Sequence, residues 1–340
     1  MRMKALVYTA PRTLQLQELP PPSPEAGSVR VRVEAVGICG SDLHAWHGHD
    51  PRRVPPLVLG HEFAGTVLEG PLAGCRVTAN PLVVCGQCRY CRQGRGNLCA
   101  HRRMIGMNIA GAFAEELSVP EQCLIELPPG LDACAAALAE PAATVLHAFA
   151  LAARSLAQPL PQARVLVIGA GAIGLLAALH LQSHGGAAAA VLEANPLRRQ
   201  RALQATGIEV RDPRQEPPAE AGADLVFDAV GSAATRTMAL HAVAPGGTVV
   251  HVGLADGASE IDMRKLTLAE VTLAGSYTYT GADLRAAVRA LAAGRFGDLS
   301  WVDERPLDEG PQAFADMAAG RVGAAKILLR PRREQGAGRS

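Results

Sequence analysis

Four cysteines lie within fifteen residues in the pattern C-x2-C-x2-C-x7-C. They are Cys85, Cys88, Cys91 and Cys99, and Gly, Gln, Arg and Tyr separate them, which is typical of a loop rather than a core strand. Four thiolates at this spacing suit a closed tetrahedral zinc site with a structural role. An iron–sulfur cluster can have similar ligand spacing. We predict a metal-binding loop, with zinc as the preferred ion.

A second set of metal-type side chains is spread more widely along the chain. A thiol, a hydroxyl, a carboxylate and an imidazole come within six positions, and another imidazole and two carboxylates follow, at Cys39, Ser41, Asp42, His44, His61, Glu62 and Glu140. One Cys, one His and carboxylates suit zinc with a replaceable ligand. Spacing alone leaves this second metal site open, because a single histidine beside a strand more often has a structural role.

A glycine pattern in the second half of the chain predicts a dinucleotide site. The motif G-x-G-x-x-G follows an apolar run at 165–168 and precedes a helical stretch at 175–183; its residues are Gly169, Gly171, Ile173 and Gly174. Such glycines allow the tight turn and the approach of a pyrophosphate to a helix N-terminus. Glu193 is placed to accept hydrogen bonds from the adenosine ribose, which favours NAD. Arg198 and Arg199 keep NADP as the alternative.

The surrounding elements change character near residue 140. Before it, alternating residues predict strands at 29–36 and 63–69, joined by long Gly- and Pro-rich segments. After it, a helical stretch at 133–151 with a break at Pro141 leads into alternating strands and helices, which indicate a parallel sheet covered on both faces. We expect the runs 261–266 and 271–274 to complete that sheet, and 283–293 to form a further helix.

Composition excludes several classes of protein. The 340 residues carry a net charge of +1, and aromatic residues make up 4%, which argues against a nucleic-acid or acidic-membrane surface. No apolar run is long enough for a membrane helix, and the N-terminus lacks a signal-peptide core. We therefore expect a cytoplasmic protein of two domains.

Together these segments resemble the zinc-dependent medium-chain alcohol dehydrogenase family, closest to its sorbitol and polyol branch. The matching segments are Gly37–His44, Gly60–Gly65, the four-cysteine loop, Gly111–Glu115, Glu140-Pro141 and Gly169–Gly174. They occur in the family's order and cover most of the chain. The resemblance implies an α/β fold: a GroES-like β-rich catalytic domain at 1–146, completed by 296–331, and a Rossmann NAD-binding domain at 147–295. We expect 332–340 to form a flexible tail.

The resemblance also implies roles for the scattered side chains. Cys39 and His61 would hold a catalytic zinc, with Glu62 and Glu140 as carboxylate ligands that exchange with solvent. Asp42 would orient His61. Ser41 would take the substrate proton, and His44 would act as the outer relay base.

The implied ligands are two zinc ions per chain, NAD, and a small alcohol or ketone substrate. The nicotinamide would be lined by Val252, Gly253, Leu254 and Ser276. No nucleic-acid or membrane partner is expected, and a homodimer or homotetramer is expected by resemblance. Arg52 and Arg53 are interpreted as solvated loop charges, with contact to an anionic substrate as the alternative.

Several functions stay open at this point. The leading hypothesis is oxidation of a secondary alcohol or polyol by hydride transfer to NAD. Threonine dehydrogenase-like, butanediol and sugar-phosphate activities are alternatives within the class. A non-catalytic module that senses nicotinamide redox state is the alternative outside it, although such a module has no need of the Ser41 and His44 relay.

Overall fold

The computed structural model describes residues 2–185 and 190–331, which divide into two compact units. Unit 1 extends to Glu140 and also holds Val302–Ala319 and the segment from Lys326 onward. Unit 2 comprises Pro141–Trp301 and Gly320–Ala325. The main divisions lie about six residues from the limits expected from the sequence, and Gly320–Ala325, expected in the first domain, groups with unit 2. The domain limits stay a prediction. The expected tail at 332–340 lies outside the described residues.

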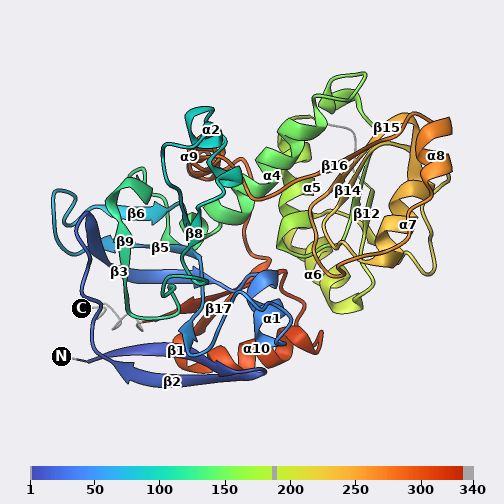
Figure 1. Ribbon diagram of the computed structural model, residues 1–340. Coiled ribbons are helices and arrows are strands. Elements are labelled where there is room, and N and C mark those ends of the chain that lie inside the picture. Colours follow the sequence, from blue (N-terminus) through green and yellow to red (C-terminus); the bar gives the residue numbers. More distant parts are fainter. Residues whose placement is uncertain (1, 186–189, 332–340) are drawn as a thin grey trace. The chain divides into compact units, whose positions relative to one another are not determined.

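Unit 1 is built on a seven-stranded sheet (Figure 1). Its strands run in the order β10 (Leu124–Glu126), β6 (Arg76–Ala79), β5 (Glu62–Val67), β3 (Ser28–Gly37), β18 (Lys326–Arg330) and β17 (Val302–Pro306), and β9 (Glu116–Pro120) also pairs with β3. Two smaller sheets are formed by β2 (Thr13–Leu19), β1 (Met3–Ala10) and β4 (Leu57–Val58), and by β7 (Leu82–Val83) and β8 (Arg103–Met104). Residues from both ends of the chain therefore share one sheet.

The predicted strand at 29–36 is β3, and it positions the chemistry of unit 1. Val29, Val31 and Val33 are buried while the charged residues between them are not, which is the alternation expected of a strand with one buried face. Antiparallel pairing sets Gly37 opposite Glu62 of β5 and opposite Leu328 of β18. Three distant segments thus meet where β3 ends.

The helices of unit 1 are short. They are α1 (Gly40–Trp46), α2 (Arg89–Arg92), α3 (Ala133–Ala137) and α10 (Gly310–Ala318). Helix α1 begins directly after β3, with Cys39 as its N-cap residue, and Asp42 in its first turn accepts a hydrogen bond from the Cys39 N–H at 3.0 Å. This local bond fixes the direction in which α1 leaves the sheet.

Unit 2 contains a six-stranded sheet whose pairs are all parallel. The order is β13 (Val210–Arg211), β12 (Ala190–Leu192), β11 (Val165–Ile168), β14 (Ala223–Asp228), β15 (Val243–His251) and β16 (Thr272–Gly275). Chain order reverses between β11 and β14, which is the position where doubly wound sheets bind ligands. The predicted Rossmann architecture is confirmed.

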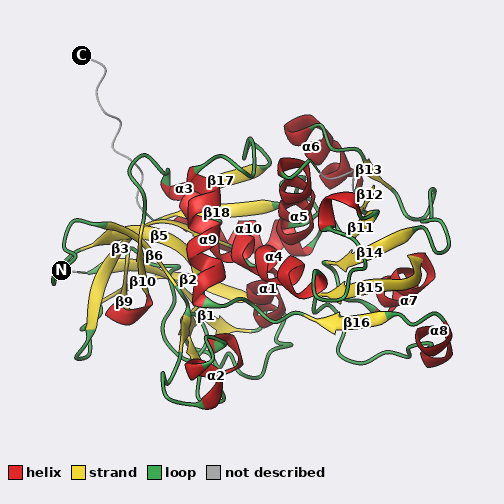
Figure 2. Cartoon of the chain, turned by 90° about the horizontal axis from the view of Figure 1, so that it is seen from above, coloured by secondary structure: helices red, strands yellow, loops and turns green. Residues whose placement is uncertain are grey.

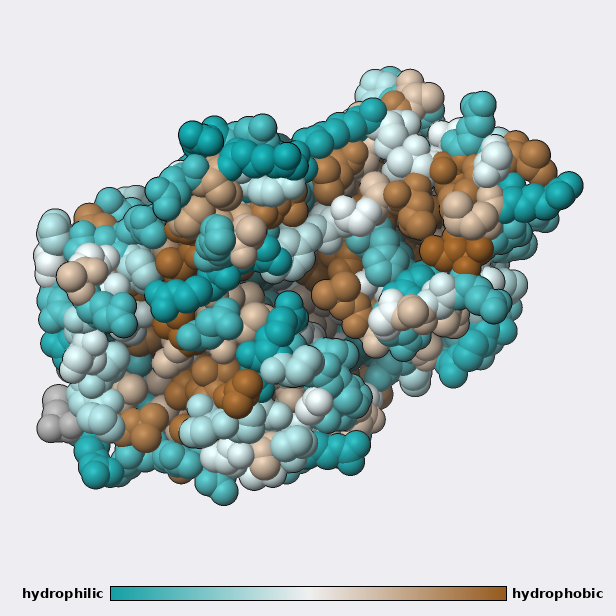
Figure 3. Space-filling view, in the orientation of Figure 1, coloured by the Kyte–Doolittle hydropathy of each residue, from teal (hydrophilic) through white to brown (hydrophobic). Residues whose placement is uncertain are grey.

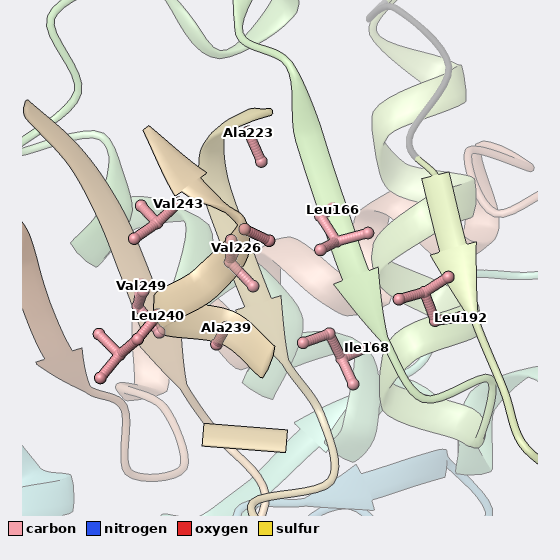
Figure 4. Close-up of a cluster of buried hydrophobic side chains, with 10 residues drawn as sticks. Leu166, Ile168, Leu192, Ala223, Val226, Ala239, Leu240, Val243 and Val249 are labelled. Carbon is pink, nitrogen blue, oxygen red and sulfur yellow. The ribbon is translucent and has the colours of Figure 1, made fainter. Parts of the chain in front are cut away.

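The helices of this part of the chain are α4 (Ala139–Ala152), α5 (Ala172–Ser183), α6 (Pro196–Thr206), α7 (Ala233–Ala242), α8 (Met263–Leu268) and α9 (Gly281–Ala292), and α5, α6 and α7 lie against the sheet (Figures 1 and 2). Figure 4 shows the core between the strands and α7, where Leu166, Val226, Leu240 and Val249 are buried together. The strands read as continuous apolar runs because both of their faces are covered.

Two local expectations are wrong. Residues 261–266 do not extend the sheet, because the Asp262 carboxylate accepts the N–H of Lys265 and so starts α8. The helical stretch at 133–151 does not break at Pro141 but at Leu138, between α3 and α4. Pro141 is the third residue of α4, where its missing N–H has no intrahelical partner to lose.

Candidate metal centres and dinucleotide site

The four cysteines predicted to bind a metal converge in unit 1. Their sulfur atoms lie within 4.8 Å of one another, and all four are free thiols. The Sγ–Sγ distances include 3.5 Å for Cys88–Cys91, 3.5 Å for Cys85–Cys99 and 3.9 Å for Cys85–Cys91. Zinc bound to four thiolates at about 2.3 Å requires S–S edges of about 3.8 Å. The donor set and its size therefore fit a tetrahedral zinc ion.

Backbone groups prepare this loop for thiolates. The N–H groups of Gln87 and Cys88 lower the pKa of Cys85 to about 6. Burial, together with the neighbouring thiols, raises the pKa of Cys91 to about 12. The loop thus stabilises the Cys85 thiolate and disfavours the Cys91 thiolate, and a divalent cation bound by the four sulfurs would supply the missing positive charge.

A second group forms where β3 ends. Ligand atoms of Cys39, His61 and Glu62 lie within 4.8 Å of one another, and His61 and Glu62 are buried. Cys39 lies just after β3, His61 directly precedes β5, and Glu62 is the first residue of β5, so the pairing of these strands brings the three together. A Cβ on Gly37 would overlap the Glu62 carboxylate, so the glycine leaves room for that carboxylate in its observed position. This is the set that spacing alone left undecided.

The Asp42 carboxylate lies beside the Nδ1 atom of the His61 imidazole. The His61 Nδ1 and Asp42 Oδ1 atoms lie 3.5 Å apart, and among the described residues neither has a hydrogen-bond partner. Burial opposes a charged imidazole, but Asp42 and Cys39 raise the pKa of His61 well above its usual range. Since Nδ1 faces the carboxylate, Nε2 is left as the atom that can bind a metal. Cys39, His61 and a carboxylate fit zinc with an open position.

Lys326 enters this site and was not predicted from the sequence. Its Nζ is 2.6 and 2.8 Å from the two Glu62 carboxylate oxygens and donates to the Ile38 carbonyl at 3.0 Å. Lysine and carboxylate are both buried. Burial opposes its charge, but Glu62, Cys39 and Glu140 raise the pKa of Lys326. The available signal was a single charge at the start of the apolar run 326–329.

Glu140 is buried, but its carboxylate lies outside the group formed by Cys39, His61 and Glu62. It contributes negative charge toward Lys326. Its role as a fourth ligand stays a prediction.

The relay residues predicted from the resemblance lie on α1. Ser41 and His44 are three residues apart and so share a helix face. The Ser41 Oγ accepts a hydrogen bond from Arg53 Nη2 at 3.1 Å. The His44 ring contacts the ring of His49 at a centroid distance of 5.3 Å. Arg53 is 3% exposed, so its interpretation as a solvated loop charge is wrong.

The glycine motif of unit 2 has the predicted turn. Gly169 follows β11 with φ +96°, and Gly171 is the N-cap residue of α5. A Cβ on Gly174 would overlap the Gly169 carbonyl, so α5 approaches the sheet closely only because this residue is glycine. The Glu193 carboxylate accepts the N–H groups of Ala170 and Asn195 at 3.0 and 2.8 Å. A hydrogen bond therefore connects the glycine turn directly to the Glu193 carboxylate.

The residues predicted to bind the rest of the dinucleotide also lie in unit 2. Arg198 Nη1 is 3.9 Å from Glu193 Oε2. Val252 and Gly253 donate their N–H groups to the Asp228 carbonyl, and the Leu254 side chain is exposed. The Ser276 Oγ is buried and has no hydrogen-bond partner among the described residues. The buried Ser276 hydroxyl is therefore available to hydrogen-bond a polar ligand.

Comparison with known proteins finds two family matches. Residues 25–129 match the family described as alcohol dehydrogenase GroES-like domain, and residues 172–293 match the family described as zinc-binding dehydrogenase. Within residues 2–185 and 190–331, no helix has the length and apolar character to cross a membrane.

Individual relatives match over nearly the whole chain. A sorbitol dehydrogenase from Halalkalibacterium halodurans is 32% identical over 97% of this chain and 99% of its own length. An L-threonine 3-dehydrogenase from Saccharopolyspora erythraea is 33% identical over 96% and 98%. The crystal structure of a zinc-binding dehydrogenase from Sinorhizobium meliloti 1021 bound to NADP has a TM-score of 0.86 at 31% identity, covering 97% of this chain and 100% of that one.

Proposed function

Because this chain belongs to the zinc-dependent medium-chain alcohol dehydrogenase family, we propose that it transfers a hydride between NAD(H) and a secondary alcohol or polyol, or the corresponding ketone. It is an oxidoreductase that acts on CH–OH groups. The observation that carries the specific proposal is the convergence of Cys39, His61 and Glu62, with Asp42 behind the imidazole. This donor set leaves a position at which a substrate oxygen can bind.

In the proposed reaction, side chains of unit 1 bind the metal ions and transfer the substrate proton. Cys39 and His61 would hold the metal, with Glu62 and Glu140 as exchangeable carboxylates, and zinc bound there would supply Lewis acidity that makes a bound hydroxyl easier to deprotonate. Ser41 takes the substrate proton and passes its own proton onward, and His44 delivers it to solvent. Cys85, Cys88, Cys91 and Cys99 hold a second zinc ion that stabilises their loop.

Unit 2 supplies the dinucleotide site. The α5 N-terminus behind Gly169, Gly171, Ile173 and Gly174 faces the pyrophosphate. Glu193, oriented by Ala170 and Asn195, accepts the ribose hydroxyls and disfavours a 2′-phosphate, which supports NAD. Arg198 beside it is the feature that supports NADP, the cofactor bound by the Sinorhizobium relative.

A polyol or secondary alcohol is preferred as substrate because Glu140 resembles the sorbitol branch and a sorbitol dehydrogenase covers nearly the whole chain. Threonine dehydrogenase-like activity is the alternative that the second relative supports. Butanediol and sugar-phosphate activities are further alternatives.

We also propose a cytoplasmic location and self-association as a dimer or tetramer. Eight free cysteines agree with a reducing compartment. Strand β16 is an edge strand with Leu273 exposed, and Leu254, Met263 and Leu268 are 63–72% exposed nearby in the chain. Figure 3 shows apolar surface in this part of unit 2. An exposed edge strand offers unpaired backbone groups to which the same strand of a second copy can bind.

Metal content and turnover together test the proposal. We expect two zinc ions per chain, and NADH formation with at least one compound in a screen of secondary alcohols, diols, sugar alcohols, their phosphates and threonine. Cys39→Ser should abolish turnover and remove one zinc ion, yet keep NADH binding, because the cofactor residues lie in unit 2. One zinc ion in the wild type, with NADH binding but no turnover, would favour the redox-sensing module instead.

A further inference from the structure

The neighbouring residues Arg52 and Arg53 differ sharply in how far their side chains are buried. Arg52 and Arg53 both pair with Asp50, at 2.8 Å in each case. The Arg52 side chain is 59% exposed, whereas that of Arg53 is 1% exposed. Burying a guanidinium costs free energy unless each of its donors is satisfied. Pairing with Asp50 does not require this burial, because Arg52 achieves it from the surface.

The buried guanidinium is directed at Ser41. Arg53 Nη2 donates to Ser41 Oγ at 3.1 Å, and Nη1 donates to the Ser41 carbonyl at 3.2 Å and to Asp50 at 2.8 Å. Its Nε donates to the Gly106 carbonyl at 3.2 Å. Asp50 and Gly106 thus accept hydrogen bonds from two sides of the Arg53 guanidinium. Its Nη1 and Nη2 atoms also contact the carbonyl and the hydroxyl of Ser41.

We propose that Arg53 is a positioning residue that orients the Ser41 hydroxyl for proton transfer; this inference rests on the proposed dehydrogenase function. A serine hydroxyl has one donor and two acceptor sites. Arg53 occupies one acceptor site, and since a guanidinium offers no acceptor, the Ser41 proton must point elsewhere. What remains free is one acceptor and one donor, which is what a relay needs.

The proton balance of the step follows from this arrangement. The substrate hydroxyl gives its proton to the free lone pair of Ser41 Oγ, and the original Ser41 proton leaves for the next acceptor. Ser41 ends with one proton, as it began, and Arg53 keeps all of its protons. The electron pair of the carbinol C–H bond leaves as hydride to the nicotinamide, as in the proposed reaction.

A second route from Arg53 to the reaction must be separated in the test. Arg53 Nη2 is also 3.9 Å from Asp42 Oδ1, and Asp42 orients His61. If the Arg53 substitution acts through Asp42 and His61, it should change the zinc content. If it acts through Ser41, zinc content and NADH binding should stay unchanged.

The experiment is a double-mutant cycle with Arg53→Met, Ser41→Ala and the combined variant, measured with the best alcohol from the screen. Asp50 keeps Arg52 in the Arg53→Met variant, so its charge is not left unpaired. If Arg53→Met folds poorly, the double variant Asp50→Asn/Arg53→Met, which also removes the charge of its partner, replaces it in the cycle. Arg52→Met is the matched control, because it removes an Asp50 partner without touching Ser41.

We expect Arg53→Met to lower kcat by about 10- to 100-fold, with KM, zinc content and NADH binding unchanged. In the Ser41→Ala background the same change should lower kcat less than about twofold, since the two residues act as one unit. Arg52→Met should match the wild type.

Three outcomes would overturn the inference. Equal losses from Arg53→Met with and without Ser41 would show that it does not act through the hydroxyl. Loss of one zinc ion would assign the effect to Asp42 and His61. A Ser41→Ala variant with normal kcat would remove the relay itself. Active wild-type enzyme in these cases leaves the proposed function standing, whereas wild type inactive on every alcohol refutes both.

Discussion

Glu193 shows how one side chain can link a turn to cofactor choice. Its two carboxylate oxygens accept the N–H of Ala170 inside the glycine motif and the N–H of Asn195 at the start of α6. The first bond joins the ends of the neighbouring strands β11 and β12, the second is local to the end of β12, and together they hold the carboxylate in one orientation. In the proposed site, a fixed negative charge here would accept ribose hydroxyls and repel a 2′-phosphate.

Changing Glu193→Ala should therefore raise the ratio of NADP to NAD use by about tenfold or more, since one lost charge contact is worth about 1–2 kcal/mol. Arg198, now without its acidic neighbour, becomes free to meet the phosphate. Steady-state kcat/KM with each cofactor measures the ratio. Glu209→Ala, which removes an exposed carboxylate of the same unit, is the control. An unchanged ratio would refute the ribose role.

At the scale of elements, the four-cysteine loop cannot be stable by itself. Helix α2 has four residues and buries none of them, and η1 (Gly96–Leu98) has three. Such short helices do not persist in water without tertiary contacts. The four cysteine sulfurs converge within this loop, so a metal ion bound to them would cross-link it.

Replacing Cys88 with serine should remove one zinc ion and destabilise the protein by at least about 2 kcal/mol. Elemental analysis and urea unfolding would measure the two effects. Cys75→Ser is the matched control, because Cys75 is a free thiol outside the cluster and its loss should leave two zinc ions. Full zinc content in Cys88→Ser would contradict the assignment of the loop.

At the scale of the whole molecule, the two units depend on different interactions. Unit 1 holds both groups of candidate metal ligands, whereas unit 2 has an apolar core and a half-buried histidine, His180. His180 on α5 stacks on Phe149 at 5.3 Å and approaches Phe296 and His184. Burial, with a smaller contribution from His184, lowers the pKa of His180 to about 4.

This shift predicts acid sensitivity. The unfolded chain, with a histidine pKa near 6.5, takes up the proton first as pH falls, so stability drops between about pH 6.5 and pH 4, by up to about 3 kcal/mol. His180→Phe keeps the aromatic stack and should remove this part of the dependence. Urea unfolding at several pH values would show it, with His241→Asn, at an exposed position, retaining the wild-type dependence. An identical acid profile in His180→Phe would contradict the prediction.

The sequence by itself determined the features that depend on near neighbours. The cysteine loop, the glycine turn and the alternation of β3 were predicted because their ligands, dihedral angles and periodicities depend on nearby positions. Glu193 and the parallel strand series were predicted from the order and spacing of strands and helices along the chain. Even at this range, 261–266 was mistaken for a strand, since a short apolar run does not reveal a helix cap such as Asp262.

Only the tertiary structure decided which distant side chains share a site. Strand pairing turns Cys39, His61 and Glu62 into one group and brings Lys326 onto Glu62 from the other end of the chain. A loop fold buries Arg53 against Ser41 while leaving Arg52 in solvent. Residue types and spacing do not encode these contacts locally: register across a sheet and the burial of a charge depend on the packing of the whole unit, so the partner of each buried group appears only once the chain has folded.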